Sequence, residues 1–233
     1  MGAAAAEAIA AALRQKLQQQ PTVRMIFAAA PSQSTMLAAL RVQPGLEWSR
    51  VEAFHMDEYL GLPKDAPQRF ASWLADAFFR HVPIGAMHRI EPHGDGLAEC
   101  TRYAALLRAA PIDFVLLGVG TNGHLAFNDP PADLADPALV KVVQLDQMCR
   151  EQQVFDGCFP TLDEVPKAAI TLTVPALLSA AEIFGCIPGA HKRAAVRAML
   201  EDPISGACPA TALRTHPRCT VYLDAASSPR GGQ

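Results

Sequence analysis

The sequence contains no uninterrupted apolar run that approaches the ~20 residues of a membrane-spanning helix, so we expect no membrane partner. The first residues, MGAAAAE, include no basic residue and already reach Glu7, which argues against a secretory signal. The six cysteines are scattered and form no C-x-x-C pair, which argues against a disulfide scaffold and a clustered zinc site. We therefore expect a cytoplasmic protein whose thiols are reduced.

The charge balance and the organisation of the chain exclude further classes. A formal net charge of −3 provides no basic field for nucleic acid, so we expect no such partner. The sequence shows no internal repeat and no linker long enough to separate domains. A chain of 233 residues can bury one full core, and we expect a single α/β domain over residues 1–233 with a disordered tail at 227–233.

Segments typical of strands and helices alternate along the chain. The expected strands lie at 23–27, 51–56, 113–117, 183–187 and 220–223, with a further extended segment at 171–174. The expected helices lie at 7–20, 36–41, 67–81, 96–109, 176–181 and 191–200. This alternation predicts a three-layer α/β fold in which a mainly parallel sheet carries helices on both faces, as in Rossmann-like, doubly wound proteins.

The segment at 118–130, GVGTNGHLAFNDP, is the most informative part of the sequence. It follows an apolar run of strand length, and its glycines allow a sharp turn and a close approach of the backbone to a ligand. In open α/β sheets, ligands bind beyond the carboxyl ends of the strands, where the imidazole of His124 is a candidate acid–base group. Local chemistry alone leaves open that this is an ordinary turn with a polar surface histidine.

Four ordered segments resemble the glucosamine-6-phosphate deaminase (isomerase) family, within the superfamily that also contains the 6-phosphogluconolactonases. The segment at 118–130 is similar to the family's Gly-Val-Gly-x-(Asp/Asn)-Gly-His-Ile-(Ala/Gly)-Phe-Asn-Glu-Pro loop. MDEYLGL at 56–62 is similar to its Met-Asp-Glu-Tyr-x-Gly-Leu segment, and the stretches at 165–192 and 208–217 resemble its later motifs. Together these matches span most of residues 23–224, and their order makes them more specific than any single motif.

The resemblance implies the conversion of glucosamine 6-phosphate and water into fructose 6-phosphate and ammonia, a step of amino-sugar catabolism. By resemblance, His124 moves the proton that opens the sugar ring, and Asp57 takes the C2 proton and returns it at C1. Asn122 and Asp129 stand at the positions that flank the catalytic histidine. We expect Glu58 to be a solvated or supporting residue. No metal or organic cofactor is implied, since the migrating proton and the amine are already on the substrate.

The small phosphorylated sugar that this reaction uses needs a cationic site for its phosphate. Lys192 matches the family's phosphate lysine, and the turn that begins at Ser32 matches the position of its phosphate-binding turn. The polar stretch at 149–153 suggests that Arg150 or Gln153 also faces the substrate. The residues expected at the substrate and its phosphate are Ser32, Gln33, Ser34, Thr35, Gly120, Gly123, Arg150, Gln153 and Lys192.

The sequence departs from the family pattern in several places. Asn122 stands where many members have Asp, and Asp129 is one methylene shorter than the family's Glu. The turn at 30–35, APSQST, contains no glycine, whereas members usually carry Thr-Gly-(Gly/Ser)-Thr there, so the identity of the phosphosugar stays open. The chain ends soon after Asp224, and we therefore expect no C-terminal regulatory extension and no allosteric control.

Two other functions fit parts of the sequence. A 6-phosphogluconolactonase would use His124 to activate water on an ester, but its loop typically continues with Thr-Ala-Ser-Leu-Phe-Pro, whereas residues 125–130 read LAFNDP. A sugar-phosphate-sensing regulator would need a DNA-binding helix-turn-helix, and this sequence has only one short helix before the domain and no basic patch. The sequence leaves open whether the chain forms a homo-oligomer and in which direction the reaction runs.

Overall fold

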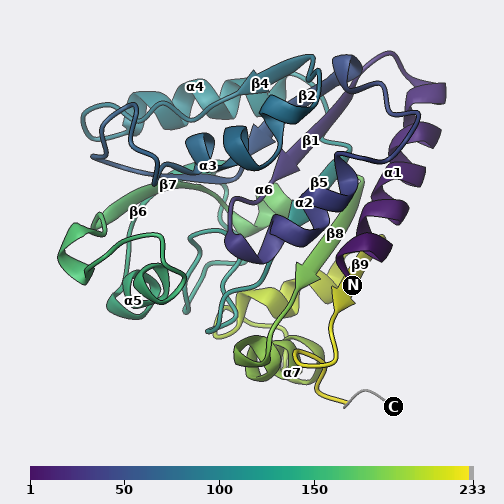
Figure 1. Cartoon of the computed structure of the whole chain (residues 1–233). Helices are drawn as coiled ribbons and strands as arrows, with labels where there is room; N and C mark the ends of the chain where they lie inside the picture. The colour runs from purple at the N-terminus through teal and green to yellow at the C-terminus, as the bar shows by residue number, and fades with distance from the viewer. Residues whose placement is uncertain (231–233) are drawn as a thin grey trace.

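The computed structural model describes residues 1–230, and residues 231–233 of the expected tail lie outside that range. The strands of its central sheet span Val23–Phe27 (β1), Val51–His55 (β2), Ala86–His88 (β4), Phe114–Leu117 (β5), Glu182–Ile187 (β8) and Cys219–Leu223 (β9). Their order in the sheet is β4–β2–β1–β5–β8–β9 (Figure 1). Every neighbouring pair is parallel, as the alternation of strands and helices predicts.

Helices cover both faces of this sheet. They span Gly2–Gln19 (α1), Ser34–Leu40 (α2), Phe70–Ala77 (α3), Leu97–Arg108 (α4), Gln147–Phe155 (α5), Val174–Leu178 (α6) and Arg193–Glu201 (α7). Successive strand residues point to opposite faces. In β1, Met25 and Phe27 belong to the core built with α1, α2 and α3, whereas Ile26 belongs to the core built with α4, α6 and α7. The predicted three-layer α/β fold is confirmed.

The boundaries of helices α1 and α3 differ most from the expected ones. Helix α1 begins at Gly2 rather than at residue 7, because the alanines before Glu7 are strong helix formers and bury Ala5 and Ala6. Helix α3 begins only at Phe70, since the preceding residue, Arg69, is extended. It ends at Ala77, because Phe78 leaves the helical conformation and a short 3₁₀ turn follows.

A second, smaller sheet was not anticipated. Its antiparallel strands span Asp57–Tyr59 (β3), Val140–Gln144 (β6) and Ala168–Leu172 (β7), and β7 lies between the other two. A single residue, Met56, separates β2 from β3. Asp57 therefore stands where the chain leaves the carboxyl end of the parallel sheet and enters the second sheet.

The order of the strands reverses between β1 and β5. From β1 the chain builds outward through β2 and β4, and then returns to β5 and builds in the opposite direction through β8 and β9. In doubly wound sheets, the crevice beyond the carboxyl ends of the strands at such a reversal is where ligands bind. The segments that follow β1 and β5 are the turn at Ser32 and the loop that carries His124.

A short turn follows β9 within the described residues. Ser227 is fully buried, and its N–H and hydroxyl donate hydrogen bonds to Asp224 Oδ1 (2.7 Å) and to the Asp224 carbonyl (3.3 Å). These bonds fix the backbone at Ser227, and the disorder expected over 227–233 stays a prediction.

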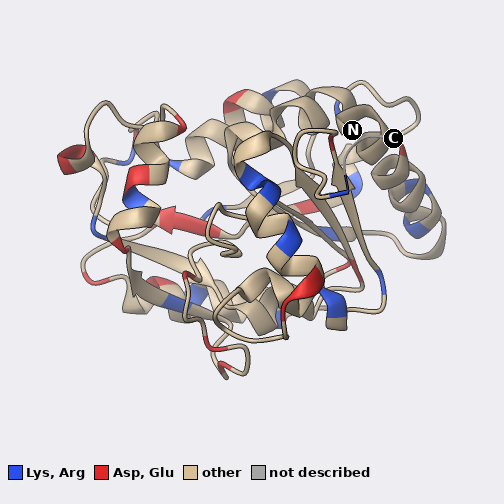
Figure 2. Cartoon of the chain, turned by 90° about the horizontal axis from the view of Figure 1, so that it is seen from below, with Lys and Arg blue, Asp and Glu red and all other residues tan. Residues whose placement is uncertain are grey.

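Over the described residues, Lys and Arg are scattered among Asp and Glu along the elements seen in Figure 2. Within residues 1–230, none of the helices combines the length and the apolar character that a membrane crossing requires.

Candidate active site

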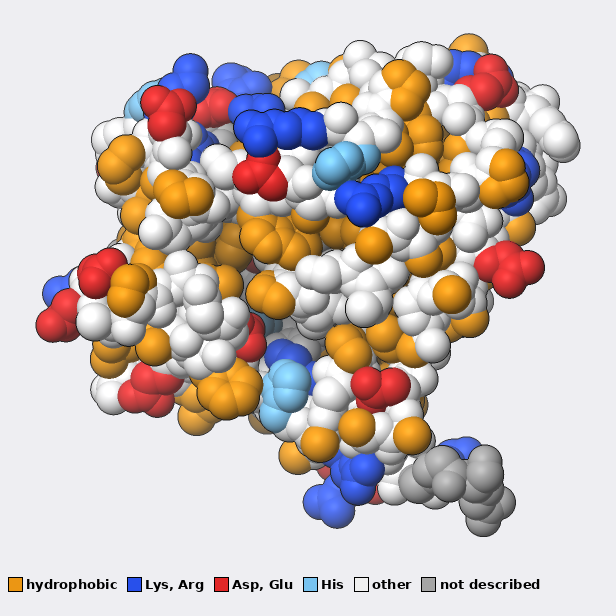
Figure 3. All heavy atoms as spheres, in the orientation of Figure 1, with side chains coloured by type: hydrophobic (Ala, Val, Ile, Leu, Met, Phe, Trp, Pro, Cys, Tyr) orange, Lys and Arg blue, Asp and Glu red, His pale blue; other side chains and the backbone are white. Residues whose placement is uncertain are grey.

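A cavity of about 350 Å³ lies where the strand order reverses. It is bounded by the turn after β1, the start of β3, the loop after β5, the end of α5 and the turn before α7. Figure 3 shows a hollow between the regions of α5 and α7 in which basic and histidine side chains gather. The polar residues that line the cavity include Ser32, Asp57, His124, Gln153, His191 and Lys192.

Asp57 is buried at the inner wall of this cavity, with 7% of its surface exposed. Its backbone is fixed by pairing with Thr171 of β7. Burial raises the pKa of the Asp57 carboxyl well above its ordinary value, because few water molecules can stabilise the charged form, and neighbouring Glu58 adds to this effect. When it is ionised, Asp57 is therefore a stronger base than an exposed aspartate.

The fully buried His55 is hydrogen-bonded to the backbone of Asp57. The Nε2 atom of His55 accepts a hydrogen bond from the Ile90 N–H at 2.8 Å, so the ring proton stands on Nδ1. Nδ1 then donates to the Asp57 carbonyl at 2.8 Å. Burial lowers the pKa of His55 to about 3, and the ring is neutral at physiological pH. His55 is thus a packing residue that holds the backbone of Asp57.

Glu58 is fully buried, which corrects the expectation that water could solvate it. Its carboxylate accepts hydrogen bonds from the backbone N–H groups of Tyr59, Phe70 and Ala71 at 3.0 to 3.1 Å, and Arg69 Nε lies 3.4 Å away. Burial raises the pKa of Glu58, although these partners oppose the shift. Glu58 fastens the first turn of α3 to β3 and does not line the cavity.

His124 and Asp129 form a close pair in the loop after β5. The imidazole Nδ1 lies 3.0 Å from Asp129 Oδ1, at ion-pair distance although not with the angle of a hydrogen bond. Asn122 joins the two, since its Nδ2 donates to the same Oδ1 at 3.0 Å and its Oδ1 accepts from the His124 N–H at 3.0 Å. Burial opposes ionisation of Asp129, but His124, Asn122 and Cys149 together outweigh it, and the pKa of Asp129 lies below its ordinary value.

Tight folding of this loop lets the shorter Asp129 reach the imidazole. Asn128 Nδ2 donates to the carbonyls of Leu125 and Leu172, both at 2.8 Å, and so fastens the loop to β7. The Asn128 N–H also donates to the Leu125 carbonyl at 3.1 Å. The backbone therefore turns back directly after Leu125, and this turn places the Asp129 carboxylate 3.0 Å from His124 Nδ1 although its side chain is shorter than that of glutamate.

The two glycines expected at the substrate have different roles. A Cβ at Gly120 would stand 2.3 Å from the His124 ring, so only glycine lets the imidazole lie against the cavity wall there. Gly123 has a φ of +85°, and a Cβ there would stand 2.5 Å from Cys208 Sγ. Gly120 lines the cavity, whereas Gly123 shapes the turn without reaching it.

The wall of the cavity also contains a cationic side chain, Lys192. Lys192 is buried, with 7% of its surface exposed, and lines the cavity together with Ser32 and His191. Burial lowers the pKa of Lys192, whereas nearby Asp156 opposes the shift. An ammonium group with so little water around it has a strong preference for an anionic ligand.

Only part of the turn at 30–35 faces the cavity. Ser32 lines it, and the fully buried Gln33 lies behind, where its Nε2 donates to Ser32 Oγ at 3.1 Å and to the Cys186 carbonyl at 3.0 Å. Ser34 and Thr35 are exposed in the first turn of α2 and do not line the cavity. Their expected contact with the substrate is therefore corrected, because the helix turns their side chains outward.

Of the two residues in the stretch 149–153 that were expected to face the substrate, one lines the cavity and the other does not. Gln153 lines the cavity, and its Oε1 accepts a hydrogen bond from Tyr59 Oη at 2.6 Å, so that its amide N–H groups remain for a ligand. Arg150 does not line the cavity. Its guanidinium donates to the carbonyls of Leu162 (2.5 Å) and Val165 (3.0 Å), which ties α5 to the segment before β7.

Several residues of the site were missed by the sequence analysis. Gln152 lines the cavity and is held by Thr121 Oγ1 (2.7 Å) and by its own bond to Asp156 Oδ1 (2.9 Å). Asp156 and Asp224 also line the cavity, and Asp224 accepts from the Gly189 N–H at 3.0 Å. The dense polar stretch at 149–153 was a usable signal for Gln152, whereas nothing in the local sequence distinguishes the two aspartates.

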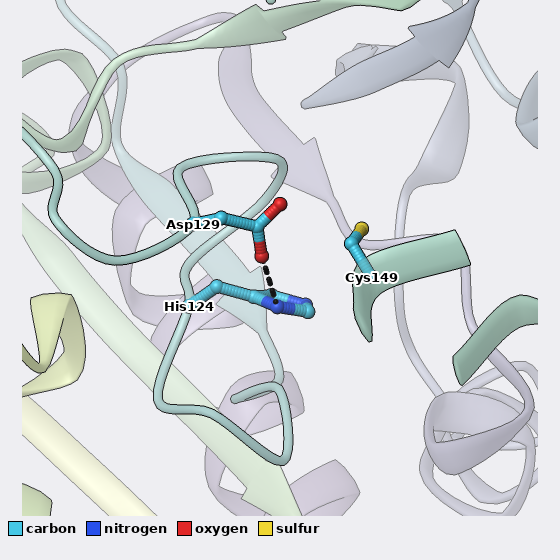
Figure 4. A group of neighbouring side chains, drawn as sticks. All are labelled: His124, Asp129 and Cys149. Atoms are coloured by element: carbon cyan, nitrogen blue, oxygen red, sulfur yellow. Dashed lines mark ion pairs between the residues drawn. The ribbon is translucent and has the colours of Figure 1, made fainter. Parts of the chain in front are cut away.

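One group of side chains in residues 1–230 has the composition and proximity to hold a metal ion. The candidate ligand atoms of His124, Asp129 and Cys149 all lie within 4.8 Å of one another (Figure 4). The chemistry of the site otherwise consists of an acid–base imidazole, a desolvated carboxyl and a buried ammonium around one cavity. This set can move protons on a ligand whose anionic end is held by Lys192.

Comparison with known proteins agrees with this geometry. A glucosamine-6-phosphate deaminase of Exiguobacterium sp. (strain AT1b) is 37% identical over 193 residues, which cover 81% of this chain and 73% of that protein. A second one, of Arthrobacter sp. (strain FB24), is 34% identical over 98% of this chain and 87% of its own length.

The similarity extends to solved structures. A monomeric glucosamine-6-phosphate deaminase superposes with a TM-score of 0.88 at 30% identity, over 97% of this chain and 93% of that one. A 6-phosphogluconolactonase from Thermotoga maritima shares the fold, with a TM-score of 0.74 at 21% identity over 94% and 92% of the two chains. The family model of glucosamine-6-phosphate isomerases/6-phosphogluconolactonase matches residues 1–222. The chain therefore belongs to this family, and the assignment that its four sequence segments suggest is confirmed.

Proposed function

We propose that the protein converts glucosamine 6-phosphate and water into fructose 6-phosphate and ammonia. The observation that carries this proposal is that Asp57 and His124 line one cavity with the buried Lys192. The chain is also similar over nearly its whole length to proteins named glucosamine-6-phosphate deaminase. The reaction joins an isomerisation to the loss of ammonia, so "deaminase" describes it better than "hydrolase".

Ring opening is the first step, and we assign it to His124. The imidazole takes the proton of the C1 hydroxyl and gives it to the ring oxygen, which yields the open-chain aldehyde. Asp129, 3.0 Å from Nδ1, stabilises the imidazolium that forms during this transfer. Asn122 holds both partners, so the pair needs little reorganisation when the substrate binds.

Proton transfer between carbons is the second step, and we assign it to Asp57. Its carboxylate removes the C2 proton of the aldehyde and returns it at C1. In the same rearrangement the aldehyde oxygen gains a proton and the amino group loses one, so that C1 carries a hydroxyl and an imine stands at C2. Water adds to this imine, and ammonia leaves to give the ketone. Burial supports the role, because the raised pKa of Asp57 makes its ionised form a stronger base.

The phosphate is held at the far side of the cavity. Lys192 provides the charge, and Ser32 provides a hydroxyl in a turn that lacks the glycines of related proteins. The amide N–H groups of Gln153, oriented by Tyr59, are available to the sugar hydroxyls. Asp156 and Asp224 line the same cavity and limit the number of anionic groups that it accepts.

We further propose that the protein acts in the cytoplasm on a small phosphorylated sugar and has no nucleic-acid partner. The net charge of −3 provides no basic field for nucleic acid, and six scattered cysteines without a C-x-x-C pair fit a reducing compartment. A lactonase reaction is the alternative within the same family. It would use His124 to activate water on an ester, but it offers Asp57 no C2 proton to remove.

Purified protein given glucosamine 6-phosphate tests the proposal, with hydrolysis of 6-phosphogluconolactone measured in parallel. We expect ammonia and fructose 6-phosphate to appear in equal amounts, and lactone hydrolysis to stay at the uncatalysed rate. Rapid opening of the lactone without release of ammonia would assign the protein to the lactonase branch instead.

A further inference from the structure

Three side chains at and beside the cavity, two from one loop and one from a helix, lie close to one another. His124 and Asp129 stand on the loop after β5, and Cys149 stands in the first turn of α5 (Figure 4). We propose that these three residues bind a borderline-soft divalent metal ion such as Zn²⁺, and that the bound ion inhibits the enzyme. Because Cys149 lies 20 residues beyond Asp129, the sequence of the loop does not reveal the third ligand.

The ligand atoms are close enough to converge on one ion. All three lie within 4.8 Å of one another. Zinc bonds of about 2.0–2.3 Å at tetrahedral angles place two ligand atoms roughly 3.5 Å apart, so side-chain rotations that move atoms by about 1 Å are sufficient. The backbone of Cys149 is well fixed for this, since its N–H donates to the helix-capping Asp146 at 2.6 Å.

Two of the candidate ligand atoms make no hydrogen bond in the described part of the chain, although His124 Nδ1 lies 3.0 Å from Asp129 Oδ1. His124 Nδ1 and Asp129 Oδ2 are buried and make no hydrogen bond within the described residues. Buried polar atoms of this kind are costly unless a partner satisfies them, and a metal ion would satisfy both. The fourth position of a tetrahedral ion remains for water, as in zinc sites with three protein ligands.

The types of ligand atom determine which metal ions the site prefers. One imidazole nitrogen, one carboxylate oxygen and one thiolate sulfur suit Zn²⁺, Co²⁺ or Cd²⁺, whereas Mg²⁺ and Ca²⁺ prefer oxygen ligands only. The thiol of Cys149 loses its proton to the solvent when the metal–sulfur bond forms. Metal binding therefore becomes stronger as the pH rises.

The bound ion is expected to inhibit ammonia release, an expectation that rests on the proposed function. An ion on Nδ1 keeps His124 from forming the imidazolium on which ring opening depends, and it takes the negative charge of Asp129 for itself. Inhibition by Zn²⁺ should consequently lower kcat, and substrate should protect only partly, since the phosphate end at Lys192 stays free.

Binding of Co²⁺ to the full chain, without substrate, tests the site independently of any activity. We expect wild-type protein to give a near-ultraviolet thiolate-to-cobalt charge-transfer band at one equivalent, and Zn²⁺ to abolish it. Cys149→Ser should lose the band and weaken Zn²⁺ binding about 100-fold or more. Cys219→Ser, which changes a thiol on β9 outside the cavity, is the matched control and should keep the band.

An absent band in the wild type, or a band that persists in Cys149→Ser, would overturn the proposal. If Cys149→Ser fails to fold by circular dichroism, His124→Gln decides the question by binding alone, because an unchanged affinity for Zn²⁺ would then refute the site. A parallel assay of ammonia release should show inhibition by Zn²⁺ but not by Mg²⁺. A protein that binds Zn²⁺ at Cys149 yet releases no ammonia would contradict the proposed function and leave the metal site standing.

Discussion

The pair formed by His124 and Asp129 predicts that Asp129→Asn slows ring opening. The carboxylate lies 3.0 Å from Nδ1 and receives a hydrogen bond from Asn122 at the same distance. An asparagine at 129 has nearly the same shape and can still accept from Asn122 through its carbonyl oxygen. The substitution therefore removes the negative charge and leaves the geometry of the loop nearly unchanged.

The size of the effect follows from the burial of the pair. Only 15% of the His124 side chain and 12% of the Asp129 side chain are exposed, so water screens their interaction weakly. An opposite charge at this range changes the balance between the two protonation states of a group by about 1–3 pKa units, or about 1.4–4 kcal/mol. We expect kcat/KM to fall about 10- to 1000-fold, with the limited exposure favouring the upper half of that range.

Steady-state release of ammonia from glucosamine 6-phosphate measures this effect. Asp129→Glu is the matched control, because it keeps the charge and restores the side-chain length that the family usually has at this position. An open-chain analogue of the substrate, which needs no ring opening, should be affected much less than the sugar. If Asp129→Asn stays within about threefold of the wild type, the charge of Asp129 does not take part in catalysis.

Three further predictions concern the other side of the cavity and the stability of the fold. Lys192→Ala removes the buried ammonium and should raise KM for the phosphorylated substrate about 10- to 150-fold, as the loss of charge-assisted hydrogen bonds predicts; an unchanged KM would place the phosphate elsewhere. Arg150→Ala should lower the free energy of unfolding by about 1–2 kcal/mol in denaturant titrations, because its bonds to Leu162 and Val165 are lost, with kcat largely retained. Asp57→Asn should raise the melting temperature at neutral pH but not well below pH 3.8, the ordinary pKa of an aspartate. The raised pKa means that the ionised carboxyl of Asp57 destabilises the folded state. This destabilisation disappears once the carboxyl is protonated in both the folded and the unfolded state. Equal changes of the melting temperature at the two pH values would therefore contradict the burial of Asp57.

The sequence predicts the central sheet well because its strands are simple to recognise. Strands such as β5 and β8 are buried on both faces and read as nearly continuous apolar runs. The smaller elements lack that signal. Strand β6, VKVVQ, is mostly half-buried, and β4 has only three residues, so neither has a pattern that distinguishes it from a loop.

The same reasoning applies to the site. Asp57, His124 and Lys192 lie in the segments that follow β2, β5 and β8, and for such segments the fold rule is sufficient to bring them to one edge. The direction of a side chain within a turn or helix depends on packing instead. Thr35 and Arg150 belong to the expected segments but point away from the cavity, because the first turns of α2 and α5 place them there.

The role of Asp57 is the central claim, and exchange of the C2 proton tests it most directly. In deuterium oxide, wild-type protein should exchange the C2 proton of glucosamine 6-phosphate and form fructose 6-phosphate that carries deuterium at C1. Asp57→Asn should bind the substrate with a similar affinity but show no exchange and release no ammonia, because an amide cannot take the proton. Exchange by Asp57→Asn at a rate close to that of the wild type would contradict the account, since another group would then be the base.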